Sequence, residues 1–449
     1  MSFPLLVFAD AARSVVLAGL AVALALPLVR SLAGLSERRR LWMWALLLVP
    51  SLLPALLVTY AYAPLALRAM AVPAGLPLLH SLALLLRLVP VAVIALHFVP
   101  PLVSAEARHC HTLLAPAPRE RRRFLLRSAA SGPWLAGGLV FLLAFADFEL
   151  ASLWNVQTWT ATLFDAHAGG LALRESLRLA AWPLALQVLV LLALSRAIGC
   201  PAEGEWSPPP RPISIAANFY LAGAAIAGGL LPLAIIGAQA LTGLSTLVAN
   251  FTLARELTAS LAVALGAAAC ASAAGRASLR RVSGAAWLTG APGLLGPLVL
   301  ALLLVTLFHL PLLRPAYDTL LPLLLALTLL LLPLALLLRW RLAATEPNPA
   351  LHVARLSRAP SFRLLWQLDG RRRFACFALL FYWAFGEFTA SSILAPVGFT
   401  PIFPRLHNLA HYGQTEVLSA MLLAAFLAPV TLLLLTAPIA RFYPRRDGR

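Results

Sequence analysis

The sequence predicts an all-α membrane protein, a polytopic bundle of about eleven transmembrane helices in two homologous halves. Hydrophobic residues make up 61% of the 449 residues and charged residues only 12%, which leaves too little polar surface for a soluble protein. The apolar runs between charge clusters are about twenty residues long, the length of a helix that crosses ~30 Å of hydrocarbon. A repeated stretch of sequence indicates the two halves.

The first span is predicted close to the N-terminus. Asp10 and Arg13 precede the first apolar run, and no small-residue cleavage pattern follows it. We therefore expect this run to remain in the membrane and not to be removed as a signal peptide. The apolar runs place the spans at residues 14–32, 41–62, 81–103, 134–154, 177–194, 213–241, 257–274, 284–310, 320–338, 374–394 and 417–440.

The repeat is visible without gaps. Residues 144–153 read AFADFELASL and residues 384–393 read AFGEFTASSI, so that Asp147 falls opposite Glu387 at an offset of 240 residues. Each stretch follows a long basic segment and precedes a predicted external loop and another span. This shared order indicates duplication.

A proline-rich segment, CPAEGEWSPPPRP at residues 200–212, divides the chain. It lacks apolar periodicity, and its prolines favour an extended connection. We expect a first half at 1–199 with about five spans, a linker on the cytoplasmic side, and a second half at 213–449 with about six.

The formal charge of +18 predicts an orientation and not a nucleic-acid partner. Most arginines fall in alternate loops and in the tail RFYPRRDGR, which the positive-inside rule assigns to the cytoplasm. An odd number of spans then places the N-terminus outside and the C-terminus in the cytoplasm. The arginines in or beside the predicted external loops are Arg13, Arg68, Arg87, Arg174, Arg178, Arg255, Arg314 and Arg405.

Two cytoplasmic segments, 104–131 and 341–373, are longer and more basic than the other predicted loops. Both contain helix-compatible stretches and occupy the same place in the repeat. A short helix that projects from a membrane domain can fit a groove on a cytoplasmic partner and transmit its motion. The alternative is a pair of basic segments that anchor the protein at the membrane surface.

Three acidic residues lie close to the outer ends of predicted spans: Asp147, Glu149 and Glu387. Ionisable groups at such positions usually face a bundle interior or an aqueous path. They are candidates for a cation-attracting vestibule, or for a structural role through pairing with arginine. Pro292 and Gly293 are predicted to kink the span at 284–310, as a hinge or as part of a substrate path.

No catalytic or nucleotide-binding motif is present, so we expect neither an enzyme nor a cofactor in this chain. The four cysteines are too scattered to predict a disulfide framework. His109, Cys110 and His111 lack a second ligand cluster, so a solvated loop is favoured over a metal site. His407 and His411 are predicted to lie on the external surface.

Three stretches resemble the fused, two-half permeases of binding-protein-dependent ABC importers of the ferric-iron and thiamine type. They are PWLAGGLVFLLAFADFELASLW at 133–154, PGLLGPLVLALLL at 292–304, and GEFTASSILAPVGFTPIFPRLHNLAHYGQTEVLSAMLLAAF at 386–426. The resemblance touches both halves. Many relatives have a further N-terminal span in the first half, which is missing here.

The resemblance implies coupling loops that dock on an ATPase, although the family's Glu-Ala-Ala and following Gly are incomplete here. The first loop keeps Glu106 and Ala107. In the second, Ala354 and Arg355 fit the pattern, and Arg358 occupies the Gly position. The coupling residues implied in the two loops are Glu106, Ala107, Arg119, Arg121, Arg122, Arg123, Ala354, Arg355, Arg358 and Arg363.

The implied function is that of the permease subunit of an importer in a bacterial inner membrane. A cytoplasmic ABC ATPase dimer would bind the ATP, and an extracytoplasmic solute-binding protein would deliver the solute. Ferric iron is the first expectation for the solute, and thiamine or another small solute is the alternative. An uncoupled secondary transporter and a membrane scaffold are the rivals from other classes.

Overall fold

The computed structural model describes residues 2–33, 35–98, 110–111, 113–114, 117–197, 215–248, 251–279, 289–344, 353–354, 356, 362–410 and 415–439. The regular structure in these ranges is helical throughout, and none of these residues is in a strand. The all-α fold class is therefore confirmed for the part of the chain that is described. The linker predicted at 200–212 lies outside the described residues.

The first half, as the term is used below, comprises the elements up to residue 197. Its last helix, α10, follows two short helices, α8 and α9. The elements are α1 (Phe3–Ala33), α2 (Glu37–Leu52), α3 (Ala55–Ala61), α4 (Ala63–Met70), α5 (Gly75–Phe98), α7 (Pro118–Phe145), α8 (Glu149–Leu153), α9 (Trp159–Ala168) and α10 (Leu173–Ala197).

The second half comprises the elements from residue 215 onward. It also has two short helices before its last one, and two stretches with wider, π-type turns, η1 and η4. The elements are α11 (Ile215–Ala225), η1 (Ile226–Leu230), α12 (Leu231–Val248), α13 (Phe251–Leu279), η2 (Ala291–Leu295), α15 (Pro297–Phe308), η3 (Arg314–Ala316), α16 (Leu321–Ala344), α18 (Phe362–Leu365), η4 (Trp366–Gly370), α19 (Arg371–Phe385), α20 (Thr389–Leu394), α21 (Ile402–Ala410) and α22 (Thr415–Ile439).

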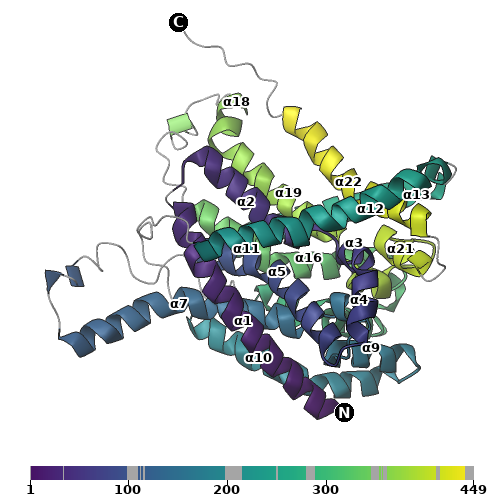
Figure 1. The fold of residues 1–449 in the computed structure, drawn as a ribbon, viewed down its shortest axis with the longest axis horizontal. Coiled ribbons are helices and arrows are strands. Elements are labelled where there is room, and N and C mark those ends of the chain that lie inside the picture. The colour runs from purple at the N-terminus through teal and green to yellow at the C-terminus, as the bar shows by residue number, and fades with distance from the viewer. Residues whose placement is uncertain are drawn as a thin grey trace, which may run out of the picture.

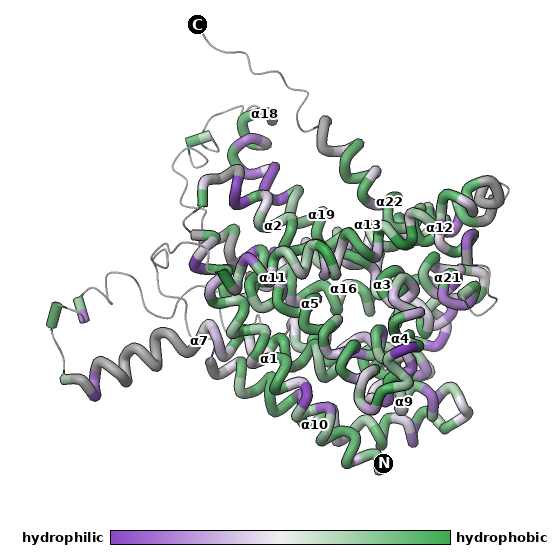
Figure 2. Tube along the Cα trace, viewed as in Figure 1, coloured by the Kyte–Doolittle hydropathy of each residue, from purple (hydrophilic) through white to green (hydrophobic). Residues whose placement is uncertain are grey.

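Eight helical segments among the described residues are long and apolar enough to cross a membrane, and α2 with α3 forms a ninth if this pair, bent by 78°, is one span. Figure 2 shows an apolar band across the bundle, with hydrophilic residues gathered near α18 on one side and near α4, α9 and α21 on the other. The chain is a multi-pass membrane protein. The number of spans, predicted as about eleven, stays a prediction.

Four predicted spans are interrupted, at 41–62 by the α2–α3 bend, at 134–154 between α7 and α8, and also at 284–310 and 374–394. The stretch predicted at 284–310 contains α15, a helix of 12 residues that begins at Pro297 after Gly296, whose φ is +90°. The stretch predicted at 374–394 breaks after Phe385, where α19 ends, and resumes as α20. A different departure from the prediction concerns the loop at 104–131. Helix α7 begins at Pro118, so the last part of this predicted loop is helical.

The element order recurs in the two halves. The series α5, α7, α8, α9, α10 corresponds to α16, α19, α20, α21, α22, and α1 corresponds to α13. The chain breaks at 146–148 and again at 386–388, at the predicted offset of 240 residues. Pro90 inside α5 and Pro333 inside α16 stand at an offset of 243. Helix α1 packs against α5 and α7, as α13 packs against α16 and α19 (Figure 1).

Helix α1 of the first half and its counterpart α13 of the second each anchor the short helix that precedes the last one. In the first half, a carboxylate oxygen of Asp10 on α1 accepts a hydrogen bond from the backbone N–H of Trp159 at the beginning of α9, at 2.7 Å. In the second, the hydroxyl of Ser260 on α13 accepts one from the N–H of Ile402 on α21, at 3.0 Å. Arg405 on α21 also pairs with Glu256 on α13. Both contacts satisfy backbone donors that a helix beginning leaves without partners.

The segment α11–η1–α12 has no counterpart among the described elements of the first half. It lies against α2 of the first half and α22 of the second (Figure 1). Gly228 and Gly229 make this approach possible, because a Cβ atom on Gly228 would lie 2.7 Å from Cγ of Pro50, and one on Gly229 would meet Val49. The hydroxyl of Tyr62 donates a hydrogen bond to the carbonyl of Ala227 at 2.5 Å.

Gly228→Val tests this contact between the halves. The new side chain would overlap the rigid ring of Pro50, and overpacking of this kind costs about 1–3 kcal/mol. We expect a lower midpoint of thermal unfolding in detergent. Gly223→Val is the matched control, because no atom lies within 4 Å of a Cβ built at that glycine. Equal midpoints for the two variants would contradict the proposed close approach.

Candidate functional site

A cavity of about 240 Å³ lies between the two halves. Its wall is built from the places where apolar segments bend or break: the α2–α3 bend, the α7–α8 break, the η2–α15 break and the α19–α20 break. Helices α5 and α16 complete the wall. Most of the lining side chains are apolar, and those with a carboxyl or guanidinium group are Arg87, Asp147, Glu149 and Glu387.

The equivalent acids Asp147 and Glu387 accept backbone hydrogen bonds at the α7–α8 break and the α19–α20 break. Asp147 Oδ2 accepts a hydrogen bond from the N–H of Ala151 in α8, at 3.3 Å. The Glu387 carboxylate accepts from the N–H groups of Ala390 and Ser391 in α20, at 2.8 and 3.1 Å. A side-chain oxygen in this position satisfies the free donors at a helix beginning. Among the described residues, each of these acids therefore has a hydrogen-bonding contact with the backbone at its break, and not the pairing with arginine that the sequence suggested as a structural role.

Buried aromatic rings fix the two breaks in place. Phe148 and Phe388 follow Asp147 and Glu387 directly, and both are buried. Phe148 packs against Phe164 of α9, with ring centroids 4.7 Å apart, and Phe388 packs against His407 of α21 at 5.0 Å. His407, predicted to lie on the external surface, therefore contacts the second break. His411 lies outside the described residues.

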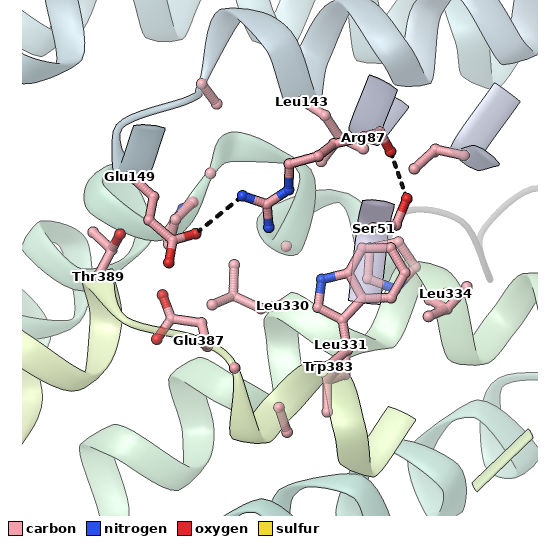
Figure 3. A pocket seen from close by; sticks show the side chains of 18 of the residues that line it. Ser51, Arg87, Leu143, Glu149, Leu330, Leu331, Leu334, Trp383, Glu387 and Thr389 are labelled. Atoms are coloured by element: carbon pink, nitrogen blue, oxygen red, sulfur yellow. Dashed lines mark hydrogen bonds and ion pairs between the residues drawn. The ribbon is translucent and has the colours of Figure 1, made fainter. Parts of the chain in front are cut away.

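Helix α5 brings two basic side chains to the acids of the first half. His80, which is fully buried, places Nε2 3.0 Å from Oδ2 of Asp147. Two helical turns later, Nη1 of Arg87 lies 3.9 Å from Oε2 of Glu149. Residues seven positions apart share one face of a helix. Figure 3 shows the Arg87 guanidinium extended toward Glu149, with the carboxylate of Glu387 below Glu149 in this view.

The second half lacks these basic residues. The offset of 243 residues that relates Pro90 to Pro333 places Leu323 and Leu330 at the positions of His80 and Arg87. At the offset of the breaks, Thr389 replaces Glu149. The charge around the cavity is therefore asymmetric although the helices are repeated. Figure 3 shows the contrast between Arg87 and Leu330.

The sequence did not single out His80 or Arg87 as functional residues. Arg87 was counted with the external arginines, but it lies well inside α5, in the apolar segment 75–97, and lines the cavity. The available signal was an ionisable side chain within an apolar run, which is costly unless it has a partner or faces an aqueous space. The partners themselves are far away in sequence and become visible only in the fold.

Gly293 and Pro292, predicted as a kink, have different surroundings. Gly293 lines the cavity, where a Cβ atom would collide with the backbone carbonyl of Leu329 in α16. This glycine is therefore required for the close contact between η2 and α16. Pro292 faces a separate apolar pocket on the other side of η2.

Among the predicted coupling residues, Arg119 and Ala354 have described side chains, and neither of them lines the cavity. Arg119 is exposed near the beginning of α7, and Arg121, Arg122 and Arg123 follow it in the same helix. Ala354 is buried, and Arg363 belongs to α18. Glu106, Ala107, Arg355 and Arg358 lie outside the described residues. Cys110 is exposed, His109 is not described, and no group of three metal-ligating side chains occurs among the described residues.

The second half supplies natural replacements for the Arg87–Glu149 pair. Arg87→Leu alone leaves the carboxylate of Glu149 without its cation, and we expect this to lower the free energy of unfolding by roughly 2 kcal/mol. Arg87→Leu/Glu149→Thr installs the residues found at Leu330 and Thr389, and most of the loss should be recovered. Thermal unfolding in lipid-containing detergent measures both. A double variant that is no more stable than the single one would show that the pair is not coupled.

Comparisons with family models, with curated proteins and with solved structures found no match to this chain.

Proposed function

We propose that this chain is the permease subunit of a binding-protein-dependent ABC importer, with its translocation path between the two halves. The cavity is the observation that supports this proposal most directly. It is enclosed by the α7–α8 break of one half and the α19–α20 break of the other. Interrupted helices at membrane depth are tolerated where the free backbone is buried or lines a cavity, and transporters use such sites for their solutes.

In this proposal the halves tilt relative to each other and expose the cavity to one side of the membrane at a time. At its break, each half contributes a short helix to the wall. Asp147 holds α8 in the first half, and Glu387 holds α20 in the second. The segments 104–131 and 341–373 receive the motion of a cytoplasmic ATPase dimer, and a solute-binding protein delivers the solute from outside. Ferric iron remains the first candidate solute and thiamine the second, both from the family resemblance.

One observation favours a second candidate, a secondary transporter driven by an ion gradient. One guanidinium and three carboxyl groups line a mostly apolar cavity, those of Arg87, Asp147, Glu149 and Glu387. Carboxylates and basic groups arranged in this way in a membrane protein are typical of proton relays and ion sites. The two candidates differ in the energy source that they require.

Co-purification tests the proposed coupling. The full chain, expressed with an ABC ATPase encoded beside it, should co-elute with that ATPase in detergent. Replacement of residues 106–123 or 351–373 by a glycine-serine segment of equal length should abolish co-elution. The same replacement at 441–449 is the control and should leave it intact. An ATPase that never associates with the full chain would rule out the importer.

Uptake into vesicles then separates the two candidates. With ATPase and binding protein present, uptake of labelled ferric iron or thiamine should require ATP and persist when a protonophore collapses the proton gradient. Uptake without ATP that the protonophore stops would identify a secondary transporter.

A further inference from the structure

A second pocket, here called the seam pocket, lies at the contact between the halves. Its volume is about 260 Å³, and its wall consists of α7 and α10 from the first half and η2 from the second. All of its lining side chains are apolar except that of Ser195. It opens at the outer face of α10, where Val188 and Leu192 are 41% and 45% exposed. In a multi-pass protein this face of a spanning helix contacts lipid chains.

The seam pocket and the central cavity share a wall. Leu139 of α7 and Leu294 of η2 line both spaces. Both side chains are buried. Whatever fills the seam pocket therefore packs directly against the back of two residues that shape the cavity.

The repeat shows what fills the equivalent place at the other seam. At an offset of 242 residues, Ala291 and Pro292 of the seam pocket correspond to Val49 and Pro50. Gly229 and Gly228 of η1 lie against Val49 and Pro50. Helix α12 continues from η1 along α22, the counterpart of α10. A helix of the chain itself thus covers one seam, and no described element of the first half covers the other.

We propose that an acyl chain of a bilayer lipid occupies the seam pocket, in the place that α11–η1–α12 takes at the opposite seam. The pocket is apolar, open to the lipid-facing side of α10, and continuous with that surface. Between apolar surfaces in a bilayer, close packing supplies the attraction, and an empty gap would forfeit those contacts. The acyl chain acts as a wedge between the halves, so its presence limits how far Leu139 and Leu294 can retreat from the cavity. This inference does not depend on the energy source of transport.

Photolabelling of the full chain tests the site. The protein is placed in phosphatidylcholine vesicles that contain a phosphatidylcholine with a diazirine near the end of one acyl chain, and labelled residues are found by mass spectrometry after irradiation. We expect labels on Leu139 and Leu294, which are only 3% and 6% exposed and out of reach of lipid that merely surrounds the bundle. Leu189, which is 64% exposed, reports that ordinary contact. Leu53, the counterpart of Leu295 at the covered seam, should remain unlabelled.

Two variants fill the pocket from different walls. Val188→Trp and Ala291→Phe should each lower labelling of Leu139 and Leu294 about tenfold, since a close-packed site has no room for both occupants. Labelling of Leu189 should not change, and Leu189→Trp is the control that adds bulk outside the pocket. Because Val188 lies at the rim, that variant tests the site even if Ala291→Phe fails to fold.

Three results would overturn the proposal. The first is labelling confined to exposed residues such as Leu189. The second is labelling of Leu139 and Leu294 that neither filling variant reduces. The third is a diazirine-bearing side chain at position 188 that crosslinks to another segment of this chain or to a second copy, and not to lipid.

Discussion

The need to satisfy backbone polar groups inside a membrane governs the rest of this structure. A continuous helix meets that need alone, whereas a broken one leaves donors and acceptors that no lipid can bind. The α7–α8 and α19–α20 breaks beside the cavity are stabilised by a carboxylate at each, which accepts a hydrogen bond from the helix that follows. The same acids therefore line the cavity and satisfy the backbone at two of the breaks that shape it.

The sequence predicted the features that depend on local pattern. The apolar runs predicted a membrane bundle, and the match between 144–153 and 384–393 predicted equivalent acids, which the structure places at equivalent breaks. Glu149 and Gly293 were also selected from sequence, and both line the cavity. These residues were recognisable because each is unusual for its immediate surroundings.

Features that depend on packing between distant helices were not predictable in this way. The pairing of His80 with Asp147 joins residues on α5 and at the α7–α8 break, and no local pattern connects them. Hydropathy predicts a complete span over the short helix α15, because it does not register that Gly296 and Pro297 interrupt the backbone. The coupling segments have too few described residues for a comparison.

The contact of Gly228 and Gly229 with Pro50 and Val49 restricts which substitutions the two halves can accept. A bulkier residue on either side would need a compensating change in the other half. The two halves are therefore not interchangeable: the second half carries a segment that fits the surface of the first, and we expect substitutions at these four positions to occur together.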